Sequence, residues 1–369
     1  AAVADANATY KDTLNIAVVQ QAPSLDLHKN SSLIARQIMD GTVFEKLVTQ
    51  NSKAEAVPEL CESYDVSDDA TTIIFHLRKG VKFHDGSEMT ADDVVASMNR
   101  WIDGFSSAKS TVGDARFEKV DDYTVKIAAD HSIILLPQMI AGAAQPAAIT
   151  TAAACEKEDS NGFLEEYIGT GPYKFTEWVQ DQYIRLDKFD DYTAYGTEGE
   201  AMDGWAGYKA APTKTLIFNY VPEATTREAG LETGQYDIID NVPNDDVERL
   251  TSNPDLHVNS YQAGTVALVF NHKQGIASNQ YFRQAVNTCL DMDEILTAVY
   301  GEGGYDLGSC YMDEAQAFWN TDAGSENYNQ KDPDKAKKIL EENGYNGETF
   351  KILVSTTNNM NYMEVAMEQ

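Results

Sequence analysis

Apolar and polar residues alternate in several short runs along this chain. A period of two is typical of β-strands that bury one face, so these runs predict strands. The segments with this pattern are residues 14–20, 71–83, 122–129, 171–189, 213–221, 236–242 and 349–356. The run at 71–83 is broken at Lys79-Gly80 and predicts two short strands, and the run at 171–189 is broken at 180–182 and predicts a hairpin.

Other segments place apolar residues three or four positions apart, as an amphipathic helix does. Residues 32–48 carry Ile34, Ile38 and Phe44 near this spacing, which predicts a helix. Residues 223–234 also have a helical pattern and stand between two predicted strands. This order predicts a strand–helix–strand unit.

Two helices in the last third of the chain are predicted from signals at their ends. Asp291 with Glu294 resembles a capping box. Asp332 is suited to an N-cap because Pro333, which follows it, loses nothing at the first helical position. Gly344 is suited to the left-handed position that ends a helix.

The segment 80–95 combines His84 with four acidic side chains, and such a group is compatible with a metal site or an acid–base pair. Local roles account for the same residues. Residues 84–86, "HDG", predict a turn, and Thr90 predicts a helix N-cap with Asp93 three positions later. His84 has no partner at a metal-ligand spacing, so we interpret the segment as scaffold.

The chain has 369 residues, which predicts two or three domains. Its formal net charge of −31 excludes nucleic acid and anionic membrane surfaces as favoured partners, because their phosphates would be repelled. The most apolar stretch, 133–149, is interrupted by prolines and glutamines and is not expected to span a bilayer. Residues 1–9 are small and polar, as in a linker that remains after a signal or lipid anchor has been removed.

The four cysteines, Cys61, Cys155, Cys289 and Cys310, are far apart and form no CxxC motif. In an oxidising compartment, pairing within domains favours Cys61 with Cys155 and Cys289 with Cys310. Cys289 also falls on the apolar stripe of a predicted helix, so a buried free thiol is an equal alternative.

No motif of a known catalytic class stands out. The chain lacks GxSxG, HExxH, P-loop and SxxK patterns, and its histidines are scattered. We expect no enzyme activity, no cofactor and no resident metal. A secreted hydrolase with paired carboxylates, or a receptor without a transport role, is the competing hypothesis.

Five motifs in this order resemble the family 5 extracellular solute-binding proteins. They are "LRKGVKFHDGSEMTADDVVASMNR", "GTGPYKFTEW", "GLETGQYDII", "LVFNHK" before "YFRQAVNTCLDMDEIL", and "DPDKAKKILEENGY". The resemblance runs from about residue 12 to the end of the sequence. Proteins of this family serve ABC importers of dipeptides, oligopeptides or nickel complexes.

The resemblance implies an α/β fold of the periplasmic-binding-protein class II, peptide-binding type. This is a clamshell of two lobes with an inserted third domain, built of mixed sheets flanked by helices. Domain I would comprise residues 1–44 and 169–263, the inserted domain II residues 45–168, and domain III residues 264–369. Relatives continue beyond this point, so domain III is expected to be incomplete here.

The resemblance also carries ligand contacts over to the loop after the "LDLH" segment. Asn30, Ser31 and Leu33 are the residues that it selects, although Ser31 and Ser32 are also suited to capping the helix that begins at Leu33.

Four further residues complete the predicted ligand site. Gly264, Thr265 and Ala267 would cross the hinge into domain III, with Gly264 permitting the bend. An ordinary buried strand is the alternative for Ala267. Phe105 would close the far side of the cleft, and its alternative is an ordinary surface aromatic.

The implied partners are a peptide ligand and an ABC permease with its ATPase subunits. A monomer is expected, tethered by the lost anchor outside the cell membrane or free in the periplasm. A nickel chelate or another small solute is the alternative cargo.

Overall fold

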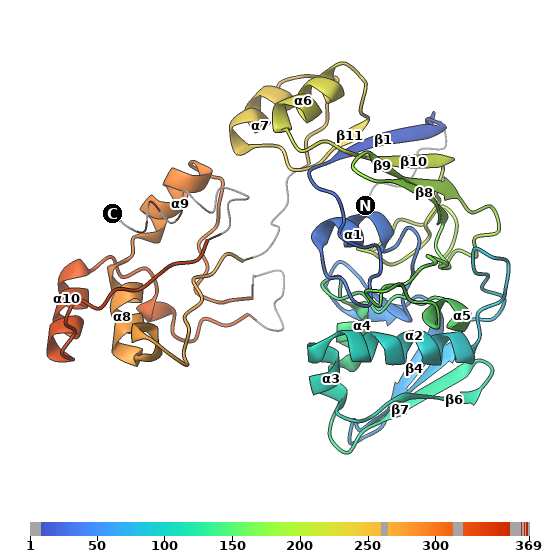
Figure 1. Ribbon diagram of the computed structural model, residues 1–369, viewed down its shortest axis with the longest axis horizontal. Coiled ribbons are helices and arrows are strands. Elements are labelled where there is room, and N and C mark those ends of the chain that lie inside the picture. The colour runs from blue at the N-terminus through green and yellow to red at the C-terminus, as the bar shows by residue number, and fades with distance from the viewer. Residues whose placement is uncertain are drawn as a thin grey trace. The chain divides into compact units, whose positions relative to one another are not determined.

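The computed structural model describes residues 9–259, 265–312 and 320–354, together with residues 363, 365 and 367. These residues form two compact units, Ala1–Val242 and Pro243–Gln369 (Figure 1). Residues 1–8 of the expected linker 1–9 lie outside the described residues. None of the described helices is long and apolar enough to cross a membrane.

The first unit contains a mixed five-stranded sheet in the order β11-β1-β10-β9-β8. Its strands are β1 (Thr13–Val18), β8 (Tyr173–Val179), β9 (Tyr183–Lys188), β10 (Thr215–Tyr220) and β11 (Ile238–Ile239). β1 runs parallel to both of its neighbours, whereas β8 and β9 form the predicted antiparallel hairpin. Helix α6 (Ala224–Glu232) connects β10 to β11, which confirms the predicted strand–helix–strand unit.

Helix α1 (Leu33–Met39) packs its buried side chains on this sheet. Ile34 and Ile38 join Leu186, Leu216 and others in one hydrophobic cluster. The helix is shorter than the predicted 32–48, because the chain turns at Gly41, which has a φ of +74°. Phe44 is still buried, but from the segment that follows the turn.

Residues 45–168, between α1 and β8, form a second layer, which we call the inserted segment. Its antiparallel sheet has the order β4-β5-β7-β6, with strands β4 (Cys61–Val66), β5 (Thr72–Leu77), β6 (Phe117–Asp121) and β7 (Thr124–Ala128). A separate two-stranded sheet pairs β2 (Val48–Gln50) with β3 (Ala56–Pro58).

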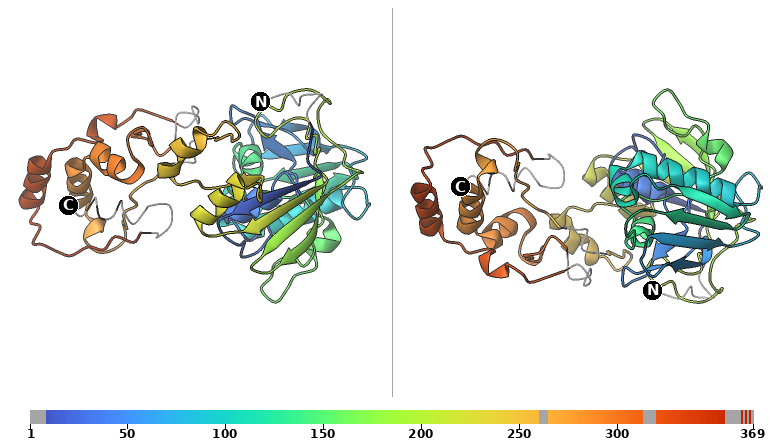
Figure 2. Two further views of the ribbon diagram at one scale, coloured as in Figure 1. Left: turned by 90° about the horizontal axis from the view of Figure 1, so that it is seen from above. Right: turned by 90° about the horizontal axis from the view of Figure 1, so that it is seen from below.

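Helix α2 (Ala91–Gly104) covers the four-stranded sheet (Figures 1 and 2). Thr90 and Asp93 form a capping box at its start, as the sequence predicts. Val94, Met98 and Trp101 are fully buried beneath it. The remaining helices of the inserted segment are α3 (Ser106–Val112), α4 (Leu136–Ala141) and α5 (Ala152–Cys155).

His84 joins the inserted segment to the returning chain. Its ring accepts a hydrogen bond from the Gly169 N–H (3.2 Å) and donates one to the Gly171 carbonyl (2.9 Å). Burial lowers the pKa of His84 to about 4, so the ring is neutral at pH 7. A β-carbon at Gly169 would lie 1.9 Å from the Val43 carbonyl oxygen, so the two backbones can meet only at glycine. This histidine therefore has a structural task, in agreement with the scaffold interpretation.

The second unit contains helices α7 (Asn244–Thr251), α8 (Gln280–Cys289), α9 (Met292–Tyr300) and α10 (Pro333–Glu342), with short 3₁₀ turns at Ile276–Ser278 and Ser325–Asn327. Both predicted caps are confirmed, since Asp291 accepts from Glu294 N–H and Asp332 from Lys335 N–H. Gly344 follows α10 with a φ of +73°.

Two strand predictions are wrong. Residues 349–354, the described part of the predicted strand 349–356, form no strand. Residues 81–83 form only a single bridge, Lys82 to Glu88, because the turn at 84–86 brings the chain straight back on itself.

All four cysteines are free in the structure, so the expected pairs do not form. Cys61 is buried in β4, whereas the Cys155 sulfur lies 3.9 Å from the Ser97 hydroxyl under α2. Cys289 is exposed, and its expected burial is wrong, because α8 buries Phe282, Ala285 and Thr288 instead.

Candidate functional site

The candidate site is the loop 19–32, which leaves the carboxyl end of β1. In open α/β sheets, ligands bind where parallel strands end, and β1 has parallel neighbours on both sides. The loop is ordered by its own side chains. Ser24 accepts a hydrogen bond from the Asp26 N–H, Asp26 from the His28 N–H, and Asn30 from the Ser32 N–H. Each bond closes a turn between residues two positions apart.

Asp26 connects this loop to the inserted segment through a fully buried carboxylate. Arg100 of α2 donates to both of its oxygens, at 2.9 and 2.7 Å, and the Leu164 N–H adds a bond at 3.0 Å. Burial alone would raise the pKa of Asp26, but the hydrogen bonds and positive charge of Arg100 outweigh it and lower the pKa. The pair is therefore charged and bidentate.

Two neighbours of Asp26 add further ties to the inserted segment. His28 donates from Nε2 to the Ala148 carbonyl (2.6 Å), and burial lowers the pKa of this histidine to about 4. Lys29 donates to Glu158 (2.7 Å) and to the Gly162 carbonyl (2.6 Å). Residues 24–28 and Asn30 are all buried, whereas Lys29 is exposed.

The surface that this loop presents includes Ser31 and Leu33. Leu33 is 56% exposed at the first position of α1. Ser31 is exposed, and Ser32 rather than Ser31 caps the helix, accepting from the Ala35 N–H. Asn30 is buried, and its amide donates to the Ser24 carbonyl. Ser31 and Leu33 are thus available to a ligand, and Asn30 shapes the loop beneath them.

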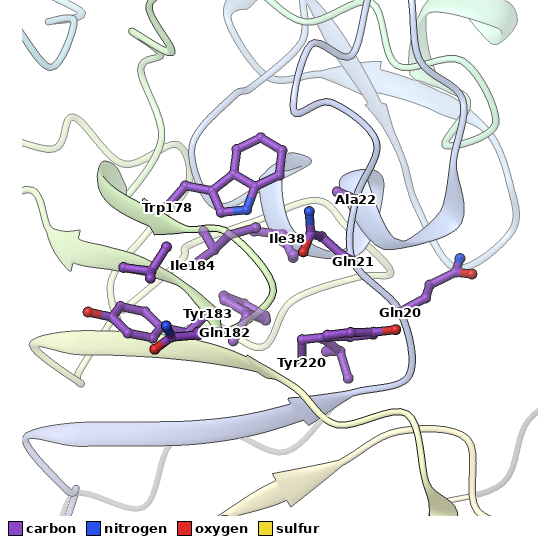
Figure 3. A pocket seen from close by; sticks show the side chains of 12 residues that line it. Gln20, Gln21, Ala22, Ile38, Trp178, Gln182, Tyr183, Ile184 and Tyr220 are labelled. Atoms are coloured by element: carbon purple, nitrogen blue, oxygen red, sulfur yellow. The ribbon is translucent and has the colours of Figure 1, made fainter.

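A shallow hollow lies beside the loop, between the hairpin and α1 (Figure 3). Trp178 and Ile184 of the hairpin line it together with Ile38 and Ala22. Its cavity volume of about 10 Å³ has room for roughly one water molecule. The Asp181 N–H donates a hydrogen bond to the side-chain oxygen of Gln21 (2.7 Å), and this bond connects the loop to the hairpin beside the hollow. The hollow is too small to hold a peptide by itself.

The other predicted site residues lie elsewhere. Phe105 is only 7% exposed and packs in the core of the inserted segment, so the expectation of a surface aromatic is wrong. The reason is that α3 begins directly at Ser106 and turns Phe105 back under α2. Thr265 and Ala267 are exposed in the second unit, and the buried-strand alternative for Ala267 does not hold. Gly264 lies outside the described residues. The structure brings Asn30, Ser31 and Leu33 together, and the ligand contacts of all seven residues remain predictions.

The sequence reasoning did not identify Asp26 and Arg100 as partners. Arg100 stands directly before Trp101 in a predicted helix, and this position was the only indication of its burial. Nothing in the sequence spacing indicated that its partner is Asp26, 74 positions earlier. Within the described ranges, no three His, Cys, Asp or Glu side chains are grouped as metal ligands.

The mixed sheet with an antiparallel layer inserted into it is the fold of the periplasmic binding proteins of the peptide-binding type. A solved example is the ABC transporter-associated periplasmic binding protein DppA from Helicobacter pylori, in complex with the peptide STSA. It matches with a TM-score of 0.71 at 24% sequence identity, over 90% of this chain and 66% of that one.

The family follows from the sequence as well. Residues 55–368 match the family described as bacterial extracellular solute-binding proteins, family 5 Middle, and the chain belongs to this family.

Two curated relatives have similar identities to this chain. Heme-binding protein A of Haemophilus influenzae is 30% identical over 334 residues, which cover 82% of this chain and 56% of the relative. Oligopeptide-binding protein AppA of Bacillus subtilis is 30% identical over 323 residues, covering 82% of this chain and 52% of the relative. The chain thus spans little more than half the length of these relatives.

Proposed function

We propose that this protein is the extracytoplasmic substrate-binding component of an ABC importer and captures dipeptides or oligopeptides. The observation that carries the proposal is the family match over residues 55–368 together with the fold. The relative named as an oligopeptide-binding protein and the solved complex with a peptide support this cargo class.

The loop 19–32 supports the proposal in physical terms. A peptide needs hydrogen-bonding groups for its backbone and apolar contact for its side chains. The Ser31 hydroxyl offers a hydrogen-bonding group and the Leu33 side chain offers an apolar contact. The two residues stand two positions apart, at the end of a loop that hydrogen bonds hold in place. A prearranged contact surface loses little conformational entropy when the ligand binds.

The proposed mechanism is closure of two lobes around the ligand, with no covalent bond made or broken. Residues 1–44 and 169–263 would form domain I, residues 45–168 domain II and residues 264–369 domain III. Thr265 and Ala267, with Gly264 at the bend, would meet the ligand from the second lobe. Phe105 would act only indirectly, by supporting α2 from the core.

The proposed partners are the permease of the importer and its ATPase subunits. The protein would work as a monomer, in the periplasm or on the outer face of the cell membrane. A lipid anchor would tether it there. The strongly negative charge disfavours nucleic acid as a partner.

Calorimetry with a defined panel tests the proposal. The panel comprises Ala-Ala, Ser-Thr-Ser-Ala, a nickel–histidine chelate and hemin, each titrated into the purified protein. We expect micromolar or tighter binding of at least one peptide, and no hydrolysis of that peptide by mass spectrometry. Hydrolysis would support the carboxylate-dependent enzyme, and binding of only the chelate or hemin would replace the peptide assignment.

Leu33→Asp sharpens the same experiment. It should weaken peptide binding about tenfold, because it places a charge where an apolar contact is expected. Val120→Asp is the matched control, since Val120 is 54% exposed on β6 and lies outside the proposed site. Equal affinities of the two variants would argue against a ligand contact at Leu33.

A further inference from the structure

The loop 19–32 depends on the inserted segment for its shape. Arg100 donates four hydrogen bonds from one guanidinium, two to Asp26, one to Glu158 and one to the Gly162 carbonyl. Asp26 belongs to the loop, 74 positions before Arg100. Glu158 and Gly162 belong to the end of the inserted segment, about 60 positions after Arg100. No other described arginine joins the loop to the inserted segment through a fully buried carboxylate.

The two carboxylates around Arg100 differ in burial. The side chain of Asp26 is 0% exposed and that of Arg100 is 8% exposed, whereas Glu158 is 35% exposed. Water screens Glu158 and weakens its ion pair. The Asp26–Arg100 pair is shielded, and its loss would leave an unpaired charge in the interior.

The geometry of the bond restricts the loop. A bidentate pair fixes the direction of the Asp26 carboxylate as well as its position. Asp26 in turn accepts from the His28 N–H, and Asn30 follows two positions later with its own turn. Through these hydrogen bonds, the orientation of the Arg100 guanidinium restricts the backbone conformation that leads to Ser31 and Leu33. Gly104, at the end of α2, adds contact, since a β-carbon there would lie 1.9 Å from the His28 carbonyl oxygen.

We infer that Arg100 is a positioning residue for ligand binding: through Asp26 it holds the loop 19–32 in the shape that presents Ser31 and Leu33. The inserted segment then contributes to binding without touching the ligand. The ligand part of this inference rests on the proposed function, whereas the effect on the loop does not.

Arg100→Lys tests the inference because it keeps the charge and removes the bidentate geometry. Hydrogen exchange of the free protein should show at least tenfold faster exchange for residues 20–33. Exchange in β5 and β7 should stay within twofold, because their buried side chains belong to a different hydrophobic cluster from those of the loop. Peptide affinity, measured with the tightest binder of the panel, should fall about tenfold.

Arg116→Lys is the matched control. Arg116 makes an ion pair with Asp103 of α2 (2.9 Å), but the two side chains are 36% and 61% exposed, and neither hydrogen-bonds to the loop. It should change neither exchange at 20–33 nor affinity. If Arg100→Lys does not fold, Asp26→Asn replaces it, because it weakens the same pair from the carboxylate side, and we then expect about threefold faster exchange in the loop.

The outcomes separate the two proposals. Unchanged exchange at 20–33 in Arg100→Lys, or faster exchange without weaker peptide binding, would overturn the positioning role. If the unmodified protein binds nothing in the panel, the proposed function fails, while the exchange measurement still decides whether Arg100 holds the loop.

Discussion

The two units of this protein differ in how they bury apolar side chains. In the first unit, two large clusters include fully buried Trp101, Phe75 and Leu186. In the second unit, the described residues form one cluster of four buried side chains, Ile295, Leu296, Val299 and Met363. Large apolar residues of that unit remain exposed, with Val269 at 84% and Leu353 at 98%.

The difference follows from secondary structure. A sheet covered by a helix buries one face of every strand, and the first unit has two such layers. The described part of the second unit contains helices and irregular segments, and no strand is found there. The first unit is therefore stabilised by packing between segments that are far apart in the sequence. The second unit depends instead on pairs of helices, such as α8 with α10.

The largest effect is expected for Trp101→Ala. Trp101 is 0% exposed, and its indole N–H donates to the Gln145 carbonyl (2.9 Å). The variant should lower the free energy of unfolding of the first unit by about 5 kcal/mol, because it leaves a cavity and an unpaired carbonyl. Denaturant unfolding with hydrogen exchange as a regional probe measures this. A loss below 1 kcal/mol would contradict the packing described for α2.

Lys209→Met should have the next largest effect. Lys209 is the buried cation between Glu59 (2.6 Å) and Glu45 (3.2 Å). Burial raises the pKa of Glu45, and Lys209 opposes this rise. Removal of the cation should cost the first unit about 4 kcal/mol and shift its thermal unfolding downward.

Lys214→Met is the control for Lys209→Met, since the ion pair of Lys214 with Asp12 is exposed on both sides. It should leave the thermal midpoint unchanged. Equal effects of the two variants would mean that the buried network does not stabilise the first unit more than a surface pair does.

A smaller effect is expected for acidification. The pKa of His28 is about 4 in the folded protein because burial disfavours the charged ring, compared with 6.5 ordinarily. Between these values the unfolded chain takes up a proton that the folded chain excludes, so stability falls as the pH falls from about 6.5 to 4. The loss approaches about 3 kcal/mol for His28, at about 1.4 kcal/mol per pKa unit.

The pH dependence of unfolding in His28→Gln checks this assignment. The variant should show a flatter decline of stability between pH 6.5 and 4 than the unmodified protein. His84 contributes in the same direction, since its pKa is also about 4, and so a part of the decline should persist. An identical slope in both proteins would disprove the role of His28.

The smallest effect is expected for Leu353→Ala in the second unit. This side chain is 98% exposed, so its truncation removes almost no packing and should change the unfolding free energy by less than about 0.5 kcal/mol. Chemical unfolding of the second unit, followed by regional hydrogen exchange, measures this. A cost of 2 kcal/mol or more would show that residue 353 is packed in solution, and the contrast between the units would weaken.

Several elements could be predicted from short stretches of sequence. The caps at Thr90, Asp291 and Asp332 depend on bonds within three residues, and all three are present. β1 and the hairpin of β8 and β9 were also predicted, because their alternation is strong. β4 and β6 were missed, since each buries only one residue completely and their pattern is correspondingly weak.

The candidate site could be predicted only in part. The resemblance selected the loop around Asn30, Ser31 and Leu33, but it could not indicate which of these side chains is buried. Phe105 was predicted to close the far side of the cleft, with a surface aromatic as the alternative, yet the turn between α2 and α3 buries it.

By itself, the sequence determined the helix caps at Thr90, Asp291 and Asp332, the strand β1, the hairpin of β8 and β9, the turn at 84–86 and the family, because each depends on neighbouring residues or on their order. The tertiary structure alone decided that His84 binds Gly169 and Gly171, that Arg100 binds Asp26, and that all four cysteines are free. These contacts join positions far apart in the chain. Their geometry depends on how whole layers pack, and no local spacing encodes it.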